Sequence, residues 1–248
     1  MCVPDTRVHR GPHPEDGKLF TADTLPRLRE ATADLSWLMT RGYALPGALQ
    51  VAGNRYELTE RQRKAVTRSS CADASLARRR AAEAPPEEMA GRELLIDGYN
   101  VLTTVEAALG GGVILHGRDG AYRDLASVHG TWRRVEETVP AVSLIGRALH
   151  EELKVARCAW YLDAPVSNSG RLKATLEAAA RENGWAWAVH LVPDPDTVLS
   201  SATAATVATA DAEVLDACGR WFALSRHVVR TYVPDDILAG PRKSGRLV

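Results

Sequence analysis

The feature that most constrains the fold is the alternation of short apolar runs with helical patterns after residue 92. Five apolar runs predict strands, and they lie at residues 93–96, 155–162, 185–192, 204–208 and 227–233. Helical spacing fills the stretches between and after them, at residues 99–109, 122–137, 141–153, 168–183 and 211–224. Strands that alternate with helices are typical of a parallel sheet covered on both faces, so we expect an α/β fold.

The residues before this alternation follow a different pattern. Residues 1–20 are rich in Pro, Gly and charge and predict a flexible tail, and residues 239–248 predict a second one. Residues 21–86 show helical spacing in 23–40, a capping box from Thr59 to Gln62 and an Ala/Arg-rich helix that ends at Pro85. We therefore expect a small helical N-terminal domain over 21–86 and an α/β domain over 92–238.

Composition excludes few classes of protein. The formal net charge is zero, which does not favour a protein that coats nucleic acid but allows local patches. The four cysteines lie far apart and show no zinc spacing. No window approaches about 18 consecutive apolar residues, and the N-terminus has no apolar signal segment. We expect a cytoplasmic protein with no membrane span, and its oligomeric state, a homodimer included, is left open.

Acidic residues follow three of the predicted strands. Asp97 closes the first strand, Asp163 closes the second, and Asp211 and Glu213 follow the fourth. Because the carboxyl ends of parallel strands open onto one edge of a sheet, these carboxylates should lie together. Clustered carboxylates repel each other, and a hard divalent cation relieves that repulsion. The sequence therefore predicts Mg²⁺ or Mn²⁺ held by Asp97, Asp163 and Asp211.

Each acid also has a simpler explanation. An Asp at a strand end often caps the next helix, as Asp211 would, and Asp163 could simply open a turn. Asp124, on the helix expected over 122–137, is either a further acid near the metal or a surface acid paired with an Arg. The prediction of a metal site depends on the joint occurrence of acids on three strands.

Two segments suit a phosphate group. Residues 167–173 form a polar loop that enters a helix, where backbone N–H groups attract anions. Its candidate contacts are Ser167, Asn168, Ser169, Arg171 and Lys173, with Arg123 as a further cation. An ordinary N-cap with surface cations explains the loop equally well. Residues 55–80 carry more Arg and Lys than acids, so the N-terminal helices either help to hold an RNA or DNA backbone or form a solvated face.

The segment Leu95-Ile96-Asp97-Gly98-Tyr99-Asn100-Val101-Leu102 resembles the opening motif of NYN domains, a branch of the PIN-like nucleases. The resemblance covers about residues 92–235 and implies a Rossmann-like sheet, a metal ligand at Asp97 and a supporting Asn100. Residues 209–213 are similar to a later Ser/Thr-x-Asp-x-Asp element, with Glu213 where a second Asp is usual. The stretch from Trp160 to Asp163 resembles the middle strand with its acid.

The whole chain also resembles the DUF434/DUF5616 group of uncharacterised bacterial and archaeal proteins. The resemblance spans both expected domains and implies a fold but no activity. The matching stretches are residues 34–43, 58–63, 96–106, 123–130 and 163–171.

Three functions are compatible with these features. The first is a metal-dependent nuclease, more on RNA than on DNA by the resemblance, in which Asn100, Glu213 and Asp124 orient ligands or water. The second is a nucleic-acid-binding protein on a degenerate nuclease fold, which the departure at Glu213 motivates. The third is a phosphatase of the haloacid dehalogenase type, which we rank last because Tyr99 stands where that chemistry needs a second Asp.

Overall fold

The computed structural model describes residues 8–126 and 130–234, so residues 1–7 and the tail expected over 239–248 lie outside the described residues. Within these ranges one parallel sheet has the strand order β5-β4-β1-β6-β7. Its strands are β1 (Glu93–Asp97), β4 (Arg157–Asp163), β5 (Trp187–Val192), β6 (Thr206–Ala208) and β7 (Arg220–Phe222). The expected α/β fold with a parallel sheet flanked by helices is confirmed.

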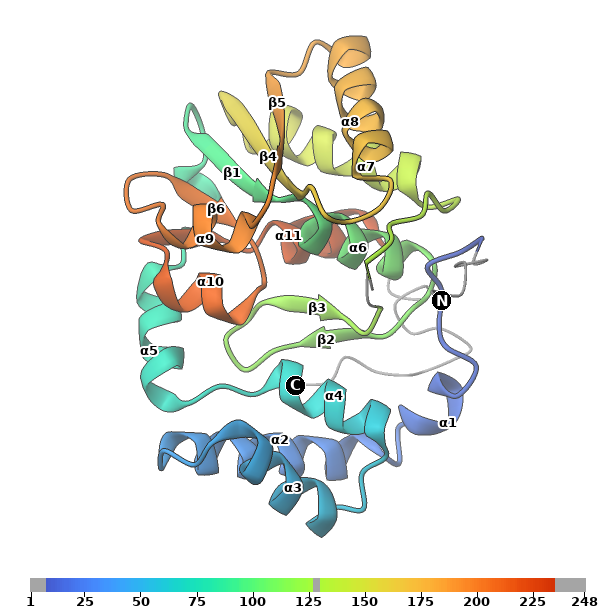
Figure 1. Cartoon of the computed structure of the whole chain (residues 1–248), viewed down its shortest axis with the longest axis vertical. Coiled ribbons are helices and arrows are strands. Elements are labelled where there is room, and N and C mark those ends of the chain that lie inside the picture. Colours follow the sequence, from blue (N-terminus) through green and yellow to red (C-terminus); the bar gives the residue numbers. More distant parts are fainter. Residues whose placement is uncertain (1–7, 127–129, 235–248) are drawn as a thin grey trace.

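The side chains of β1 alternate between two apolar layers, because successive residues of a strand point to opposite faces. Leu94 and Ile96 belong to the larger core, with α6 (Gly98–Leu109), α7 (Thr138–Arg147), α8 (Ser169–Asn183) and α11 (Leu224–Tyr232). Leu95 packs against a smaller cluster with α9 (Pro195–Ser200) and α10 (Ala212–Ala217). Helices therefore cover both faces of the sheet (Figure 1).

The order of the strands places a switch point beside β1. The chain passes from β1 to β4 and β5 on one side and then crosses to β6 and β7 on the other. Register pairs Ile96 of β1 with Trp160 of β4 and with Ala208 of β6. Ligands of open α/β sheets bind at the carboxyl ends of the strands next to such a point. The ends of β1 and β6 are therefore the first place to look for a site.

Three expected elements differ from the structure. The strand expected over 227–233 lies in helix α11, where Leu224, Val228 and Val229 are buried at helical spacing despite the β-branched residues. The helix expected over 211–224 ends at Ala217, and β7 follows it. The helix expected over 122–137 begins instead as strand β3 (Tyr122–Asp124), which pairs antiparallel with β2 (Ile114–His116). Asp124 is therefore a strand residue.

The N-terminal helices are α1 (Asp16–Leu19), α2 (Leu25–Thr40), α3 (Leu45–Arg55), α4 (Glu60–Ser69) and α5 (Asp73–Ala82), with a 3-10 turn at Pro86–Glu88. The capping box at Thr59 and Gln62 is confirmed. These helices share their apolar core with the β2–β3 hairpin, since Leu28 and Val66 belong to one cluster with Leu115 and Leu125. The hairpin lies between α4 and the rest of the α/β part (Figure 1).

The described part of the expected N-terminal tail is packed. Phe20 is fully buried, and Arg10 forms a buried ion pair with Glu106 of α6, with 2.9 Å between Nε and Oε2. The hydroxyl of Thr138 donates to the other oxygen of Glu106 at 2.6 Å. The prediction of a flexible tail is therefore wrong for residues 8–20.

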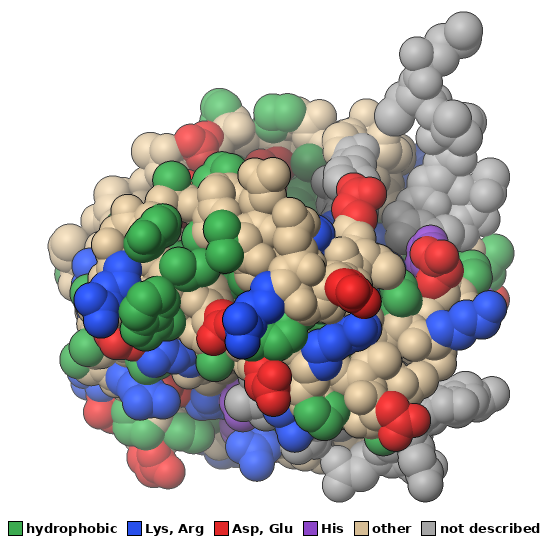
Figure 2. Space-filling model, turned by 90° about the horizontal axis from the view of Figure 1, so that it is seen from below, with side chains coloured by type: hydrophobic (Ala, Val, Ile, Leu, Met, Phe, Trp, Pro, Cys, Tyr) green, Lys and Arg blue, Asp and Glu red, His purple; other side chains and the backbone are tan. Residues whose placement is uncertain are grey.

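The face formed by α2 and α3 mixes hydrophobic and charged side chains (Figure 2). Its exposed large hydrophobic residues are Trp37, Tyr43, Leu45 and Val51. In the described part of the chain, no helix combines the length and the apolar character that a membrane span requires.

Candidate functional site

A pocket of about 510 Å³ opens beside the carboxyl ends of β1 and β6, and we call it the acidic pocket. Four aspartates reach it from different elements, namely Asp97, Asp124, Asp196 and Asp211. Tyr99, Asn100, Thr103 and Thr104 of α6 form one wall, and Thr67, Arg68 and Ser70 form another. The pocket therefore joins the N-terminal helices to the sheet edge at which the sequence predicted a site.

Asp97 is the most buried of the acids predicted to bind metal. One oxygen accepts a hydrogen bond from the backbone N–H of Asn100 at 3.4 Å, and the other accepts one from the hydroxyl of Thr209 at 2.7 Å. Burial raises the pKa of Asp97 to about 7; the hydrogen bond from Thr209 opposes the shift, and repulsion from Asp196 and Asp211 adds to it. Asp97 is therefore poised to exchange a proton near neutral pH.

Asn100 links the ends of two strands. Its side-chain oxygen accepts a hydrogen bond from the backbone N–H of Ala210 at 2.9 Å, and the hydroxyl of Thr209 accepts one from the N–H of Asp211 at 3.0 Å. Asn100 and Thr209 thus fix the loop after β6 against the start of α6. The supporting role expected for Asn100 takes the form of loop positioning.

Gly98 explains why α6 can begin so close to the sheet. A Cβ atom at this position would lie 2.3 Å from Cδ2 of Leu162 and 3.0 Å from the backbone oxygen of Tyr161. Any side chain here would force Leu162 to move and would crowd the backbone of β4, so glycine is favoured. The glycine of the Asp-Gly-Tyr-Asn segment is therefore a packing requirement that sets the position of Asp97 and Asn100.

Asp211 caps α10, as the simpler explanation of this acid predicts. Its Oδ1 accepts hydrogen bonds from the N–H groups of Glu213 at 2.8 Å and Val214 at 3.2 Å. Its Oδ2 accepts none from the described residues. Asp211 therefore both caps a helix and offers an oxygen to the acidic pocket. Glu213 does not line this pocket.

Asp196 is a pocket residue that the sequence analysis missed. It lies in the first turn of α9, where no helix was expected, and its carboxylate makes no hydrogen bond or ion pair with the described residues. Partial burial, and then repulsion from Asp211 and Asp163, raise its pKa to about 6. The signal that could have found it is the one used for the other acids, because Asp196 follows strand β5.

Asp163 does not reach the acidic pocket. It ends β4 in register with Val192 of β5 and is absent from the pocket lining. Among the residues that the structure describes, no group of three His, Cys, Asp or Glu side chains is placed to hold a metal ion. The expected ligand set Asp97, Asp163 and Asp211 is therefore not assembled in this structure.

Asp124 brings a half-satisfied carboxylate to the pocket. Its Oδ2 accepts hydrogen bonds from the hydroxyls of Thr103 at 3.3 Å and Thr104 at 3.0 Å. Its buried Oδ1 lies 3.8 Å from a guanidinium nitrogen of Arg68 and accepts no hydrogen bond from the described residues. The hydroxyls of Thr67 and Tyr99 are also buried without a hydrogen-bond partner in the part of the chain that the structure describes. Buried polar atoms are nearly always hydrogen-bonded, so these three atoms indicate that the acidic pocket receives water or a polar ligand.

Arg123 lines the acidic pocket, but each nitrogen of its guanidinium group donates a hydrogen bond within the protein, so its contact with phosphate stays a prediction. Its Nε donates to the backbone oxygen of Ala210 at 2.7 Å, and its two other nitrogens donate to Asp119 at 2.9 and 2.7 Å. Arg79 of α5 donates to the same carboxylate at 2.7 Å. Burial opposes ionisation of Asp119, but the two guanidinium groups outweigh it and lower the pKa to about 2.

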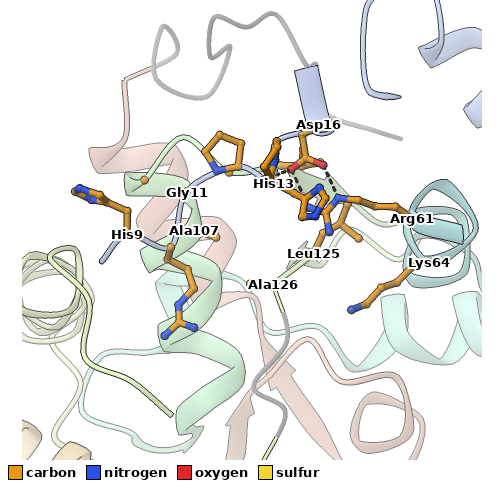
Figure 3. A pocket seen from close by; sticks show the side chains of 15 residues that line it. His9, Gly11, His13, Asp16, Arg61, Lys64, Ala107, Leu125 and Ala126 are labelled. Atoms are coloured by element: carbon orange, nitrogen blue, oxygen red, sulfur yellow. Dashed lines mark hydrogen bonds and ion pairs between the residues drawn. The ribbon is translucent and has the colours of Figure 1, made fainter. Parts of the chain in front are cut away.

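Cations near the acidic pocket lie on one face of α4, since Arg61, Lys64 and Arg68 are three and four residues apart. Arg61 and Lys64 line a neighbouring pocket of about 720 Å³, where Arg61 pairs with Asp16 (Figure 3). Burial, and then the charges of Arg68 and Arg61, lower the pKa of Lys64. Other cations expected to hold nucleic acid already contact side chains of the protein. Arg63 donates a hydrogen bond to Asn54, and Arg78 forms an ion pair with Asp216.

The loop expected to bind phosphate lies away from the acidic pocket. Ser169 is buried, with its hydroxyl 3.4 Å from the backbone oxygen of Ala164, and Lys173 lies 3.7 Å from Glu177. Asn168 and Arg171 line a different pocket, together with Arg133 and Arg134. The structure therefore separates the expected phosphate loop, Ser167 included, from the acids.

Fold and site together define an α/β protein with buried carboxylates at the carboxyl edge of a parallel sheet. Residues 86–227 match DUF5616, a domain of unknown function, and residues 27–81 match DUF434, a protein of unknown function. The chain belongs to the DUF5616 family, which confirms that resemblance. It is 29% identical over 189 residues to the uncharacterized protein MJ0935 of Methanocaldococcus jannaschii, covering 76% of this chain and 88% of that one. No solved structure matches the chain.

Proposed function

We propose that this protein is a divalent-metal-dependent phosphodiester hydrolase, with a PIN-like or NYN-like fold, that cleaves RNA. The observation that carries the proposal is the crowding of Asp97, Asp196 and Asp211 at one pocket. Burial, and then repulsion between these carboxylates, raise the pKa of Asp97 to about 7 and that of Asp196 to about 6. A cation relieves such repulsion. The resemblance of residues 95–102 to NYN domains supplies the class of reaction.

The carboxylates fit a loosely held cation better than a closed cage. Mg²⁺ commonly binds one or two carboxylates and completes its shell with water and substrate phosphate. Asp196 and Asp211 each offer oxygens that accept no hydrogen bond from the described residues, and would hold the ion, whereas both oxygens of Asp97 are engaged. A bound Mg²⁺ or Mn²⁺ would stabilise charge on the phosphate and lower the pKa of a bound water.

Side chains of this protein supply the other requirements of phosphodiester cleavage. Arg68 is held at the pocket by its hydrogen bonds to the backbone oxygens of Asp124 and of Ala126, and its positive charge favours a phosphate there. The unpartnered hydroxyls of Thr67 and Tyr99 can donate to phosphate oxygens. Asp97 has a pKa suited to accepting a proton near neutral pH.

A second candidate is an RNA-binding protein with little or no turnover. Two observations favour it: no three-ligand metal group exists among the described residues, and Glu213 lies outside the acidic pocket. The cationic face of α4 would then be the main contact to the phosphate backbone. A haloacid dehalogenase-type phosphatase ranks third, because Tyr99 occupies the position of its second Asp.

The test is cleavage of a fluorescently labelled single-stranded RNA, and of DNA with the same sequence, in Mg²⁺, Mn²⁺ or EDTA. We expect metal-dependent cleavage of RNA that falls at least about tenfold in Asp196→Asn and Asp211→Asn. Asp97→Asn should also lose cleavage while it remains folded. The matched control is Glu182→Gln on the exposed side of α8, which should cleave like the wild type.

Three outcomes separate the candidates. Equal cleavage by the wild type and all variants would assign the activity to a contaminant and remove the proposal. RNA binding that persists in EDTA, with no cleavage in either metal, would establish the second candidate. Cleavage in EDTA at the rate seen with Mg²⁺ would exclude a metal-dependent reaction.

A further inference from the structure

A pocket of about 680 Å³ lies between residues 131–134 and the first turns of α8, away from the acidic pocket. Its charged lining residues are Arg133, Arg134 and Arg171, and no Asp or Glu lines it. Backbone hydrogen bonds join the two sides of the pocket. The N–H of Trp132 donates to the backbone oxygen of Ser167 at 3.0 Å, and the N–H of Ser167 donates to the backbone oxygen of Gly130 at 2.9 Å. The pocket is therefore a built feature of the fold.

The polar groups that this pocket leaves unused are donors. Within the described residues, the guanidinium groups of Arg134 and Arg171 make no hydrogen bond or ion pair, and both side chains are exposed. Trp132 is 1% exposed, and its indole N–H has no hydrogen-bond partner there. An indole N–H and a guanidinium can only donate, so their natural ligand is an anion.

The start of α8 also favours an anionic ligand. Asn168, at the N-cap, has a left-handed φ of 68°, and its side chain does not cap the helix but donates to the backbone oxygen of Trp132 at 3.0 Å. Asn168, Arg171 and Thr175 line the pocket from the first two turns of this 15-residue helix. The N-terminal end of a helix carries partial positive charge. The N–H groups of Ser169 and Arg171 already donate to the backbone oxygens of Val166 and Asn168, so the helix contributes this charge rather than free donors.

We propose that this pocket binds a phosphate group through Arg134, Arg171 and the indole N–H of Trp132, with the partial positive charge at the start of α8 beside it. Planar guanidinium groups match pairs of phosphate oxygens, and these three side chains can only donate hydrogen bonds. The phosphate can belong to a terminal phosphomonoester of a nucleotide or to the backbone of a polynucleotide. Binding here requires no metal and does not depend on the hydrolase proposed above.

The experiment follows the indole N–H signal of Trp132 by NMR, assigned with Trp132→Phe, while isothermal titration calorimetry measures the dissociation constant. All titrations contain EDTA at constant ionic strength. The ligands are inorganic phosphate, uridine 5′-monophosphate and an RNA oligonucleotide with hydroxyl groups at both ends. A response to the first two alone identifies a terminal phosphate, and a response to the oligonucleotide identifies a backbone phosphate.

Variants test the assignment to these residues. Arg134→Gln with Arg171→Gln should weaken binding at least about tenfold and abolish the shift of the Trp132 signal. The control is Arg181→Gln, which removes the same charge from the last turn of α8, about 15 Å along the helix. If the double variant does not fold, Arg134→Gln alone is measured. An unchanged Trp132 signal with every ligand, or an equal loss of affinity in Arg181→Gln, would overturn the proposal.

Discussion

Asp119 shows how much one buried carboxylate can organise. It lies between β2 and β3 and accepts hydrogen bonds from Arg79 of α5 and from Arg123 of β3. Arg79 in turn binds Asp216 of α10 at 2.8 Å, and Arg123 binds the loop after β6. A single residue thus connects the N-terminal helices, the hairpin and the edge of the acidic pocket.

We predict that Asp119→Asn destabilises the protein by about 3 kcal/mol or more at pH 7, because two buried guanidinium groups lose their counter-charge. The pKa of Asp119 in the folded protein, about 2, is below its ordinary value of 3.8. Its stabilising contribution is therefore complete above pH 3.8 and is lost as the pH falls from 3.8 through 2. The free energy of unfolding in urea, measured from pH 7 to pH 2.5, should show the gap between wild type and variant narrowing below about pH 4.

The control for this prediction is Asp73→Asn. Asp73 pairs with Arg118 at the surface, where its side chain is 62% exposed, and such pairs contribute less than about 1 kcal/mol. The proposed role of the buried network would be contradicted by either of two results for Asp119→Asn. One is a loss of free energy of unfolding that stays constant over the whole pH range, and the other is a loss as small as that of Asp73→Asn.

Individual site residues were only partly predictable. Asp97 and Asp211 were placed correctly, because a strand end determines the edge of the sheet that an acid reaches. Asp163 satisfies the same rule but lies outside the pocket, since the rule does not say which way a side chain turns once its strand has ended. Asp196 was missed because no helix was expected between the strands at 185–192 and 204–208, whereas Pro195 begins helix α9 there.

At the scale of elements, the ion pair between Arg10 and Glu106 attaches the N-terminal segment to α6. Both side chains are almost completely buried. Burial raises the pKa of Glu106, while Arg10 and the hydrogen bond from Thr138 act against the shift. A buried charge is tolerated only with such partners, so the segment before α1 and the middle of α6 are energetically coupled.

We predict that Arg10→Met destabilises the protein by about 3–5 kcal/mol, because Glu106 is left as a buried charge without its counter-ion. The double variant Arg10→Met with Glu106→Met should be more stable than Arg10→Met alone, since no charge is then buried. Urea unfolding of the wild type, of Arg10→Met, of Glu106→Met and of the double variant forms a complete cycle. Strictly additive changes in the free energy of unfolding would show that the two residues are not coupled.

Elements with a clear period or a clear end signal were predicted, and several short strands were not. Strands β1 and β4, helix α8 with its stop at Gly184, and the capped start of α4 agree with the sequence patterns. Strands β2, β3 and β7 have three residues each, too few to show a period of two. Helix α11 was mistaken for a strand because packing against the core overrode the β-branched preference of its valines.

At the scale of the whole molecule, the two family matches do not correspond to two independent bodies. The apolar cluster of the N-terminal helices includes Leu115 and Leu125 from the hairpin region, and Thr67 and Arg68 line the acidic pocket with Asp97. The core around the hairpin and the acidic pocket each contain residues from both sides of the expected boundary near residue 90.

We predict that the described body unfolds in one cooperative step. Leu35→Ala, in the fully buried core of α2, should cost about 2–5 kcal/mol and should lower hydrogen-exchange protection in β1 as well as in α2. The measurements are urea unfolding followed by tryptophan fluorescence and by far-ultraviolet circular dichroism, and amide exchange by mass spectrometry. Non-coincident transitions, or unchanged protection in β1, would show that the N-terminal helices unfold separately.

The lining of the acidic pocket spans residues 67–212 of the chain, and this has a consequence for biosynthesis. Proteins emerge from the ribosome N-terminus first, so Thr67 and Arg68 leave the ribosome long before Asp211. The pairing of β6 with β1 and the contact of Asn100 with Ala210 place the loop that carries Asp211 beside Asp97. A nascent chain that has not yet reached residue 212 therefore has no complete pocket, and any chemistry that depends on the pocket begins only after synthesis has passed that residue.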